Sequence, residues 1–314
     1  MAFQANQPLQ EGTIVEKYRI MRLLAAGGFS FVYLAQDENE SPVVIKEYLP
    51  STLALRTNGA ATPRVPEADQ QTFLFGMKCF FEEGRALAHL SHPNVVRVLN
   101  FFRANETAYL VMRYERGRTL QEHIQQRRGP LEEEWMRSTF AQLLNGLREV
   151  HTQKLLHLDI KPGNVYLRNN ATPLLIDFGA ARHTLSDEGM KLAPTFTPGF
   201  ASPEQHARRE HLGPWSDIYS VGATLYACFA AAAPQPANWR LEKDQLVPAR
   251  RVWAGKYSAE LLDIIDWCLR LDHLERPQSV FALQKALLGE KQPARRGEAP
   301  MMDRLRGMLQ IKFK

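Results

Sequence analysis

The hydrophobic pattern changes its period once along the chain, near Gly117. Before this glycine, short apolar runs are typical of β-strands, and they cover 18–35, 42–47, 95–102 and 108–114. One stretch there, 72–90, has apolar residues at helical spacing. After Gly117, helical patterns prevail at 120–127, 131–152, 216–232, 259–271 and 279–288, with short apolar strands at 165–167 and 174–176. We therefore expect an α+β fold of two lobes: a small β-rich N-lobe with one main helix (13–115) and a larger, mostly helical C-lobe (117–289).

Composition excludes several classes of protein. Of the 314 residues, 45% are apolar and 23% are charged, which is globular rather than disordered. The longest uncharged apolar run, 221–234, is too short to span a bilayer, and residues 1–8 lack the features of a secretory signal. Three cysteines lie far apart and form no C-x-x-C pair. We expect a reduced, cytoplasmic protein without a disulfide framework or zinc site.

The positive charge is concentrated at the C-terminal end. The formal net charge is +5, and residues 290–314 hold seven Lys or Arg against three Asp or Glu. The rest of the chain is close to neutral, so its charge gives no argument for nucleic-acid binding. We expect a linker followed by a basic amphipathic segment over 301–314. Four alternatives stay open for this segment: it binds a membrane surface, binds a protein partner, packs on the main body or is disordered.

Residues 157–164, His-Leu-Asp-Ile-Lys-Pro-Gly-Asn, concentrate polar chemistry that core packing does not explain. In such a loop Asp159 can accept a hydroxyl proton, and Lys161 can neutralise a transferring phosphoryl group. Asn164 can ligate a metal ion. Asp177 directly follows the apolar strand at 174–176, a suitable place to bind a hard divalent cation that carries phosphates.

The N-lobe pattern holds three further candidate features. Gly27 and Gly28 join two strands, where small residues let backbone N–H groups approach a polyphosphate, although such a pair is more often a plain hairpin turn. Lys46 ends an apolar strand, where it can pair with phosphates or be an ordinary edge lysine. Glu83, on the following helix, can hold Lys46 or face solvent beside Glu82.

Together and in this order, these segments resemble the eukaryotic-like (Hanks-type) protein Ser/Thr kinases over about residues 13–290. Ser202-Pro203-Glu204 matches the A-P-E motif of that family, and Asp217 and Arg276 match two further positions. The segments 46–50 and 197–200 are similar to those of bacterial kinases encoded beside type VI secretion systems. The resemblance implies a kinase domain over 13–289, preceded by a short lead at 1–12.

The resemblance also implies a role for each matched residue. Asp159 would accept the proton of the substrate hydroxyl, and Lys161 would contact the γ-phosphate. Asn164 and Asp177 would hold Mg²⁺, for which Mn²⁺ is an alternative. Lys46, oriented by Glu83, would bind ATP, and the other residues implied to contact ATP are Gly27, Gly28, Phe29, Ser30, Val32, Val44, Met112, Tyr114 and Tyr166. The family pattern gives substrate-binding or bracing roles to Thr197, Glu204, Asp217 and Arg276, and Lys161 with Thr197 favours Ser/Thr specificity.

Some positions depart from the family around the nucleotide. Ala25 and Ser30 stand where glycines are usual, and a Cβ there restricts positive φ, so we expect slower nucleotide handling. Val44 replaces the usual alanine and Tyr166 the usual leucine, which predicts a narrower adenine slot. The insertion at about 50–70 is longer than usual, and we favour a tolerated surface loop over a regulatory or docking element.

Leu158 replaces the arginine of the H-R-D motif. In the family that arginine grips a phosphorylated activation-loop residue, which leucine cannot do. Phosphorylation of Thr184, Ser186 or Thr195 is therefore not expected to be the main switch.

The leading interpretation is an active, autophosphorylating protein Ser/Thr kinase in bacterial signalling. It would act on protein substrates, with a cognate phosphatase as a candidate partner, and lie in the cytoplasm or peripherally at the inner membrane. The first alternative is a pseudokinase scaffold that binds nucleotide or partners without turnover. The second is a small-molecule phosphotransferase, which the Glu204 and Arg276 matches and Thr197 disfavour.

Overall fold

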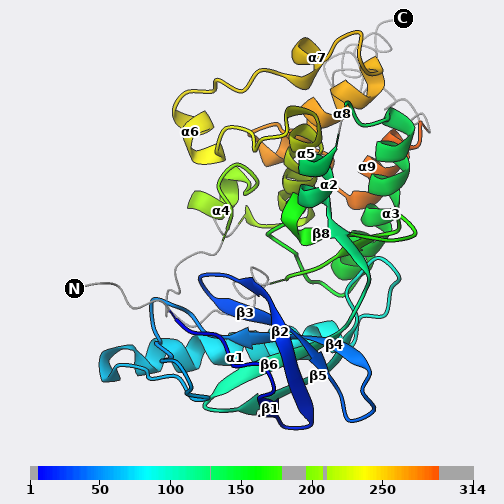
Figure 1. Cartoon of the computed structure of the whole chain (residues 1–314). Helices are drawn as coiled ribbons and strands as arrows, with labels where there is room; N and C mark the ends of the chain where they lie inside the picture. Colours follow the sequence, from blue (N-terminus) through cyan, green and yellow to red (C-terminus); the bar gives the residue numbers. More distant parts are fainter. Residues whose placement is uncertain (1–5, 128, 179–195, 208–210, 290–314) are drawn as a thin grey trace, which may run out of the picture.

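The computed structural model describes residues 6–127, 129–178, 196–207 and 211–289, and these form two lobes (Figure 1). The N-lobe is a six-stranded antiparallel sheet in the order β1-β2-β3-β4-β6-β5 with one long helix against it. Its elements are β1 (Ile14–Val15), β2 (Tyr18–Ala26), β3 (Ser30–Gln36), β4 (Pro42–Tyr48), α1 (Gln70–Ala88), β5 (Val98–Ala104) and β6 (Thr107–Arg113). The α+β, two-lobed fold predicted from the sequence is confirmed.

Helix α1 lies against β5 and β6 because its buried face is mainly apolar and includes the small residue Gly84. Phe73, Met77 and Phe80 are buried on this face. At Gly84 the sheet comes so close that an added Cβ would lie 3.0 Å from a methyl carbon of Leu110. The close approach brings the neighbouring Glu83 to the inner side of the lobe, where it is buried.

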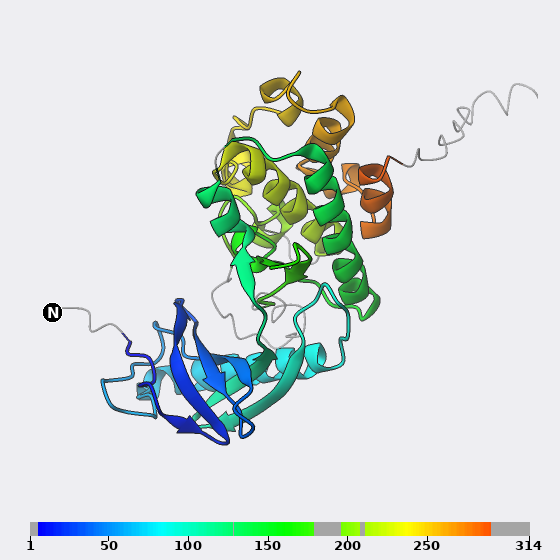
Figure 2. The same cartoon turned by 45° about the vertical axis from the view of Figure 1, so that its right-hand side comes forward.

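The C-lobe is built around α5 (Pro214–Ala230), which is buried at every residue from 216 to 228 and packs against α8 and α9. The long helix α3 also packs on α9. The other elements are β7 (Gly117–Thr119), α2 (Leu120–Gln126), α3 (Glu133–Thr152), β8 (Val165–Arg168), β9 (Pro173–Leu175), α4 (Pro203–Ala207), α6 (Ala237–Glu242), α7 (Ala249–Val252), α8 (Ala259–Cys268) and α9 (Val280–Leu287). Figure 2 shows the two lobes at opposite ends of the molecule. The sheet and α1 form one lobe, and the green to orange helices form the other.

The junction between the lobes differs from the sequence-based expectation. A strand was expected over 95–102, but β5 begins only at Val98. The residues before it pair with the C-lobe instead: Val96 N donates to Leu175 O (2.9 Å), and Leu175 N donates to Asn94 O (2.8 Å). This backbone bridge ties the N-lobe to β9, which ends two residues before Asp177.

Three short helices, α4, α6 and α7, were not predicted from the sequence. Each has six residues or fewer, too few to show a helical period. Within the ranges that the structure describes, no helix combines the length and the apolarity needed to cross a membrane.

Candidate active site

A cavity of about 570 Å³ lies between the two lobes. Val32 and Val44 line it from the N-lobe sheet, and Asn164, Tyr166 and the end of β9 line it from the C-lobe. A second hollow of about 700 Å³ lies between α3 and α9, but its Glu133 and Arg137 are already paired at 2.8 Å. The convergent polar groups therefore place the candidate site between the lobes.

The wall of the cavity contains the residues expected beside the adenine. Val44 and Met112 are cross-strand partners in β4 and β6, which sets them side by side. Tyr166 Oη donates to Glu115 O at 3.2 Å, so its ring is tethered to the segment that joins the lobes. Tyr114 lines the same cavity. These four expected positions are thus brought together, with bulky side chains at both Val44 and Tyr166.

The hairpin between β2 and β3 carries Gly27, Gly28, Phe29 and the first residue of β3, Ser30. Gly27 N donates to Ser30 O at 2.9 Å. Neither Ala25 nor Ser30 has a positive φ, so the Cβ that replaces a family glycine costs no backbone strain at either position. The slower nucleotide handling expected from these two substitutions stays a prediction.

Lys46 is buried at 4% exposure, and its Nζ forms an ion pair with Asp177 Oδ1 at 2.5 Å. Glu83, the residue expected to orient Lys46, lines the same cavity from α1 and is buried. The structure thus gathers all three charged groups. In this arrangement Lys46 neutralises a carboxylate expected to hold a cation.

The residues of 157–164 converge on the carboxylate of Asp159. Lys161 Nζ and Asn164 Nδ2 each donate to Oδ2 at 2.8 Å, and Thr197 Oγ1 donates to Oδ1 at 2.9 Å. Lys161 Nζ also donates to Thr197 Oγ1 at 2.6 Å. Four residues predicted from the sequence therefore form one cluster, although Thr197 lies more than thirty positions further along the chain.

His157 joins the two segments that bear the acidic residues. Burial lowers the pKa of His157, so the imidazole is neutral. Its Nδ1 accepts a hydrogen bond from Asp159 N, and its Nε2 donates to Ile176 O, each at 3.3 Å. Its ring also packs on Phe178, with the centroids 4.3 Å apart. The backbone before Asp177 is thereby held in register with the backbone at Asp159.

Asp217, on α5, holds the backbone of the 157–164 loop. Its carboxylate accepts hydrogen bonds from His157 N (2.9 Å) and Leu158 N (2.7 Å), and His151 Nε2 lies 2.7 Å away. Burial alone would raise the pKa of Asp217, but the hydrogen bond with His151 and the other polar contacts outweigh it and hold the pKa below its ordinary value. These bonds stabilise Leu158 in a left-handed conformation, φ 60°, which is unfavourable for a leucine.

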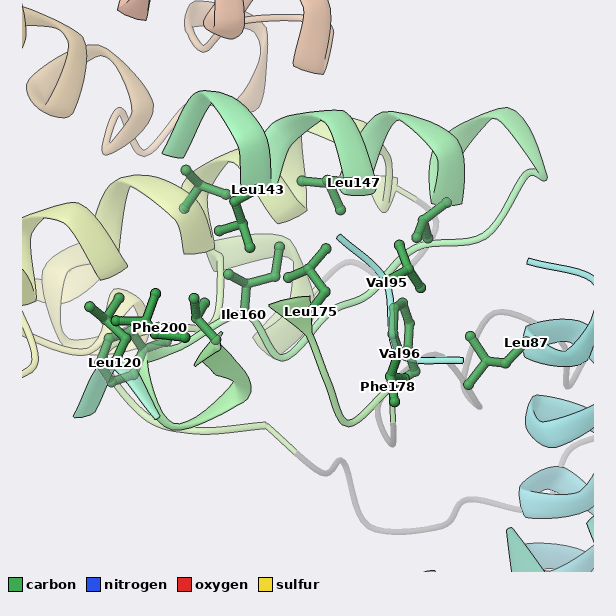
Figure 3. Close-up of a cluster of buried hydrophobic side chains, with 14 of the residues drawn as sticks. Leu87, Val95, Val96, Leu120, Leu143, Leu147, Ile160, Leu175, Phe178 and Phe200 are labelled. Carbon is green, nitrogen blue, oxygen red and sulfur yellow. The ribbon is translucent and has the colours of Figure 1, made fainter. Parts of the chain in front are cut away.

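Asp177 also has a positive φ, 61°, a conformation that aspartate tolerates better than most residues. The neighbouring Phe178 is buried in an apolar cluster with Leu87 of α1 and Val96 (Figure 3). The cluster continues through Val95 and Leu175 to α3. This packing fixes Phe178 and so directs Asp177 toward the cavity.

The donor set near Asp177 fits a hard divalent cation. Both donors of the Asn164 amide nitrogen are used by Asp159, through its main-chain oxygen and its Oδ2, each at 2.8 Å. The Asn164 amide oxygen remains as a ligand, and the side chain of Asp177 is 44% exposed toward the cavity. Carboxylate and amide oxygens are the ligands that Mg²⁺ takes.

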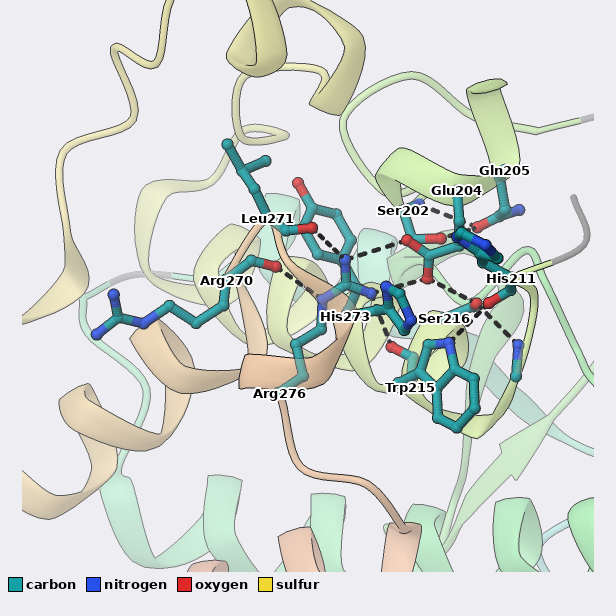
Figure 4. A network of polar contacts seen from close by, with 12 residues as sticks. Ser202, Glu204, Gln205, His211, Trp215, Ser216, Arg270, Leu271, His273 and Arg276 are labelled. Carbon is teal, nitrogen blue, oxygen red and sulfur yellow. Dashed lines mark hydrogen bonds and ion pairs between the residues drawn. The ribbon is translucent and has the colours of Figure 1, made fainter. Parts of the chain in front are cut away.

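Away from the cavity, Glu204 and Arg276 form the expected ion pair, with oxygen–nitrogen distances of 2.8 and 3.1 Å (Figure 4). Arg276 also donates to the main-chain oxygens of Arg270 and Leu271, and Ser216 Oγ donates to Glu204 at 2.7 Å. Burial alone would raise the pKa of Glu204, but the hydrogen bonds from Arg276 and its positive charge outweigh this effect, so the pKa lies below its ordinary value. The pair fixes the start of α4 against α5.

Sequence reasoning missed several residues that hold this site. Gln205 Nε2 donates to Leu158 O at 2.8 Å, and His151 contacts Asp217. No sequence signal identifies either residue, because each acts through a partner far along the chain. The activation-loop candidates Thr184, Ser186 and Thr195 and the segment 301–314 lie outside the described residues.

Most of the insertion at 50–70 lies at the surface, as favoured from the sequence, but Ala54 and Arg56 are buried at 4% and 1% exposure. Arg56 is held by an ion pair to Glu47 of β4 at 2.6 Å. The insertion is therefore anchored to the N-lobe sheet.

Comparison with known proteins agrees with this geometry. The family model described as "Protein kinase domain" matches residues 18–288. The chain belongs to the protein kinase domain family. It is 30% identical over 306 residues to serine/threonine-protein kinase pkn3 of Myxococcus xanthus, covering 92% of this kinase chain and 52% of that protein. It is 29% identical to serine/threonine-protein kinase Nek5 of Mus musculus, covering 87% of this chain and 41% of that one.

Among solved structures, the kinase chain is similar to the apo form of PpkA-294, with a TM-score of 0.79 and 32% identity. That match covers 89% of this chain and 99% of the other. By contrast, the chain spans about half or less of the length of the two curated relatives. The likeness thus concerns the kinase domain.

Proposed function

We propose that the chain is an active protein serine/threonine kinase that transfers the γ-phosphoryl group of ATP to hydroxyl groups of protein substrates, its own included. The observation that carries this proposal is the cluster around Asp159. A general base must lie within hydrogen-bond reach of a hydroxyl. Thr197 Oγ1, a hydroxyl of the chain itself, already donates to Asp159 Oδ1.

In the proposed reaction, Asp159 accepts the proton of the incoming hydroxyl. The hydroxyl oxygen bonds to the γ-phosphorus while the bond from that phosphorus to the bridging oxygen breaks, which leaves ADP and a phosphoester. Lys161 offsets the negative charge of the transferring group, since its ammonium lies 2.8 Å from Asp159. The chain contributes position and charge rather than covalent chemistry.

Asn164 and Asp177 would hold Mg²⁺, with Mn²⁺ as the alternative. When bound, the cation supplies charge neutralisation to the phosphate oxygens. Lys46 pairs with Asp177 at 2.5 Å and lines the cavity from the N-lobe side, where its ammonium group would contact the phosphates.

The same contact favours the alternative of a pseudokinase, because a lysine that stays paired with Asp177 is not available to phosphates. The Glu204–Arg276 pair argues against a small-molecule phosphotransferase, because in the family this pair braces a region that binds polypeptides.

Transfer of radiolabel from ATP distinguishes these functions. The wild type, Asp159→Asn and the matched surface variant Asp263→Asn would be incubated with either metal. We expect label in the wild type and Asp263→Asn, and a rate lower by about 10²–10⁴-fold in Asp159→Asn. Equal labelling of Asp159→Asn would contradict the proposed role of Asp159. A wild type that binds ATP but transfers no label with either metal would establish the pseudokinase.

We also infer that the substrates are cytoplasmic proteins of a bacterium and that a phosphatase reverses the modification. The similarity to kinases encoded beside type VI secretion systems stays a prediction. For the segment 301–314, co-sedimentation with anionic vesicles of the full chain and of a 1–289 truncation tests the membrane alternative. Identical pelleting would end it.

A further inference from the structure

A second buried ion pair lies on the other face of β4 from the catalytic lysine. Successive side chains of a strand point to opposite faces, so Lys46 faces the cavity and Glu47 faces away. Glu47 is fully buried, and Arg56 is 1% exposed. Their contact is bidentate, with Nη1–Oε1 at 2.6 Å and Nη2–Oε2 at 2.7 Å. The proposed reaction makes no use of this pair.

Both charged groups of the pair are saturated with hydrogen bonds. Glu47 also accepts from the hydroxyls of Tyr33 and Tyr109, each at 2.8 Å. The guanidinium of Arg56 has five N–H groups, and besides Glu47 their acceptors are Gln7 O (2.9 Å), Tyr33 Oη (3.0 Å) and Ala61 O (3.4 Å). A lysine has three donors on a point charge and cannot replace this planar fork. The pair is therefore specific to arginine.

Arg56 anchors a segment that reaches the Gly-rich hairpin. Leu49 N donates to Phe29 O at 3.0 Å, and Ser51 N donates to Gly28 O at 2.8 Å. Ser51 Oγ donates to the same Gly28 oxygen at 3.1 Å. Residues 49–51 thus hold two consecutive carbonyls at the tip of the hairpin.

Holding those carbonyls also orients the adjacent N–H groups. In a trans peptide the C=O and the following N–H point in opposite directions. The bond to Gly28 O therefore turns the N–H of Phe29 away from Ser51. Side-chain packing cannot set this orientation at Gly28, since a Cβ there would meet nothing within 4 Å.

We propose that Arg56 is a positioning residue for ATP: its ion pair with Glu47 anchors residues 49–56, whose donors hold the carbonyls of Gly28 and Phe29 and set the Gly-rich hairpin over the cavity. The proposal rests on the proposed kinase function, because it assigns ATP to that cavity. It gives the insertion a role in nucleotide binding, beyond stabilising the N-lobe.

The test replaces Arg56 by lysine and uses Arg64→Lys as a matched control, an exposed arginine in the same insertion. We expect Arg56→Lys to raise the KM for ATP and the Kd for a non-hydrolysable ATP analogue by about 10-fold. We expect kcat at saturating ATP and the KM for a peptide substrate to change by less than about threefold. Arg64→Lys should match the wild type. A folded Arg56→Lys variant with wild-type KM and Kd for nucleotide would overturn the proposal.

Ser51→Ala decides the matter if Arg56→Lys does not fold. It leaves the ion pair in place and removes one hydrogen bond to Gly28 O, so we expect a rise in nucleotide Kd of about two- to fivefold. An unchanged Kd in this variant would equally overturn the proposal. Because Kd is measured without turnover, a wild type that binds the analogue but transfers no phosphate would refute the proposed function and still leave Arg56 tested.

Discussion

Within the ranges that the structure describes, each lobe contains a buried, bidentate Glu–Arg ion pair, and the two pairs are built differently. In the C-lobe, Arg276 joins Glu204 across 72 positions of the chain and takes further main-chain acceptors from Arg270, Leu271 and Trp215. In the N-lobe, Arg56 joins Glu47 across nine positions. The first pair closes a long loop of the C-lobe, whereas the second fastens an insertion to the strand it follows.

The environment of the two carboxylates also differs. Glu204 has one further side-chain donor, Ser216 Oγ, whereas Glu47 has two tyrosine hydroxyls. Removing one partner of a buried pair leaves the other charge uncompensated, and the cost depends on the donors that remain. Comparable burial therefore does not imply a comparable contribution to stability.

The largest loss of stability is expected for Arg276→Met. Glu204 would keep only the Ser216 hydroxyl among its side-chain donors, so the free energy of unfolding should fall by about 3–5 kcal/mol. Urea unfolding measures it. A smaller loss of stability in Arg276→Met than in Arg56→Met would contradict the expected order of the two pairs.

Arg56→Met should cost less, about 2–3 kcal/mol, because Tyr33 and Tyr109 still donate to Glu47. Adding Glu47→Gln to this variant should restore part of the loss, since the uncompensated charge is then removed. Urea unfolding of the single and double variants checks both statements. Strict additivity of the two substitutions would show that the groups do not interact.

The C-lobe pair should be sensitive to acid. The pKa of Glu204 is lowered in the folded state, so near and below the ordinary glutamate value of about 4.3 the unfolded chain binds more protons than the folded one. The stability contributed by Glu204 is present above that value and is lost as pH falls through the folded pKa. Glu204→Gln should therefore lose less stability than the wild type between pH 6 and pH 3, as measured by thermal unfolding. Parallel losses would contradict this.

The N-lobe pair should instead be sensitive to alkali. Burial and the nearby Glu47 raise the pKa of Tyr33 and of Tyr109, so above the ordinary tyrosine value of about 10 the unfolded chain releases protons that the folded one retains. The stability contributed by these hydroxyls is present below that value and declines as pH rises above it. Tyr109→Phe should show a shallower decline than the wild type in thermal unfolding above about pH 10. An equally steep loss of stability in Tyr109→Phe and the wild type would show that Tyr109 does not contribute to the sensitivity to alkali.

The same comparison shows how much the sequence could predict. Glu204 and Arg276 were assigned to a bracing role because both lie in segments that match the kinase family, and the structure places them 2.8 Å apart. Glu47 and Arg56 were not paired, because Arg56 lies in an insertion without periodicity and its burial depends on tyrosines from two other strands. Short-range patterns cannot report such contacts.

The cluster around Asp159 follows the same rule. Asp159, Lys161 and Asn164 lie within six residues, so their convergence was predictable from spacing. The contact between Lys46 and Asp177 was not, since the family resemblance assigned Lys46 to Glu83 as its orienting residue and to phosphates as its ligand. The left-handed backbone of Leu158 also has no sequence signal, because Asp217 stabilises it from a distant helix.

The central claim is that Asp159 acts as the base in transfer of phosphate to serine or threonine. Mass spectrometry of the wild type and of Asp159→Asn after incubation with ATP and Mg²⁺ tests it most directly, with the acceptor residues identified by fragmentation. The account predicts phosphate on serine or threonine side chains in the wild type and almost none in Asp159→Asn. The same phosphorylated residues at the same occupancy in both proteins, after equal short incubations of freshly dephosphorylated samples, would contradict it.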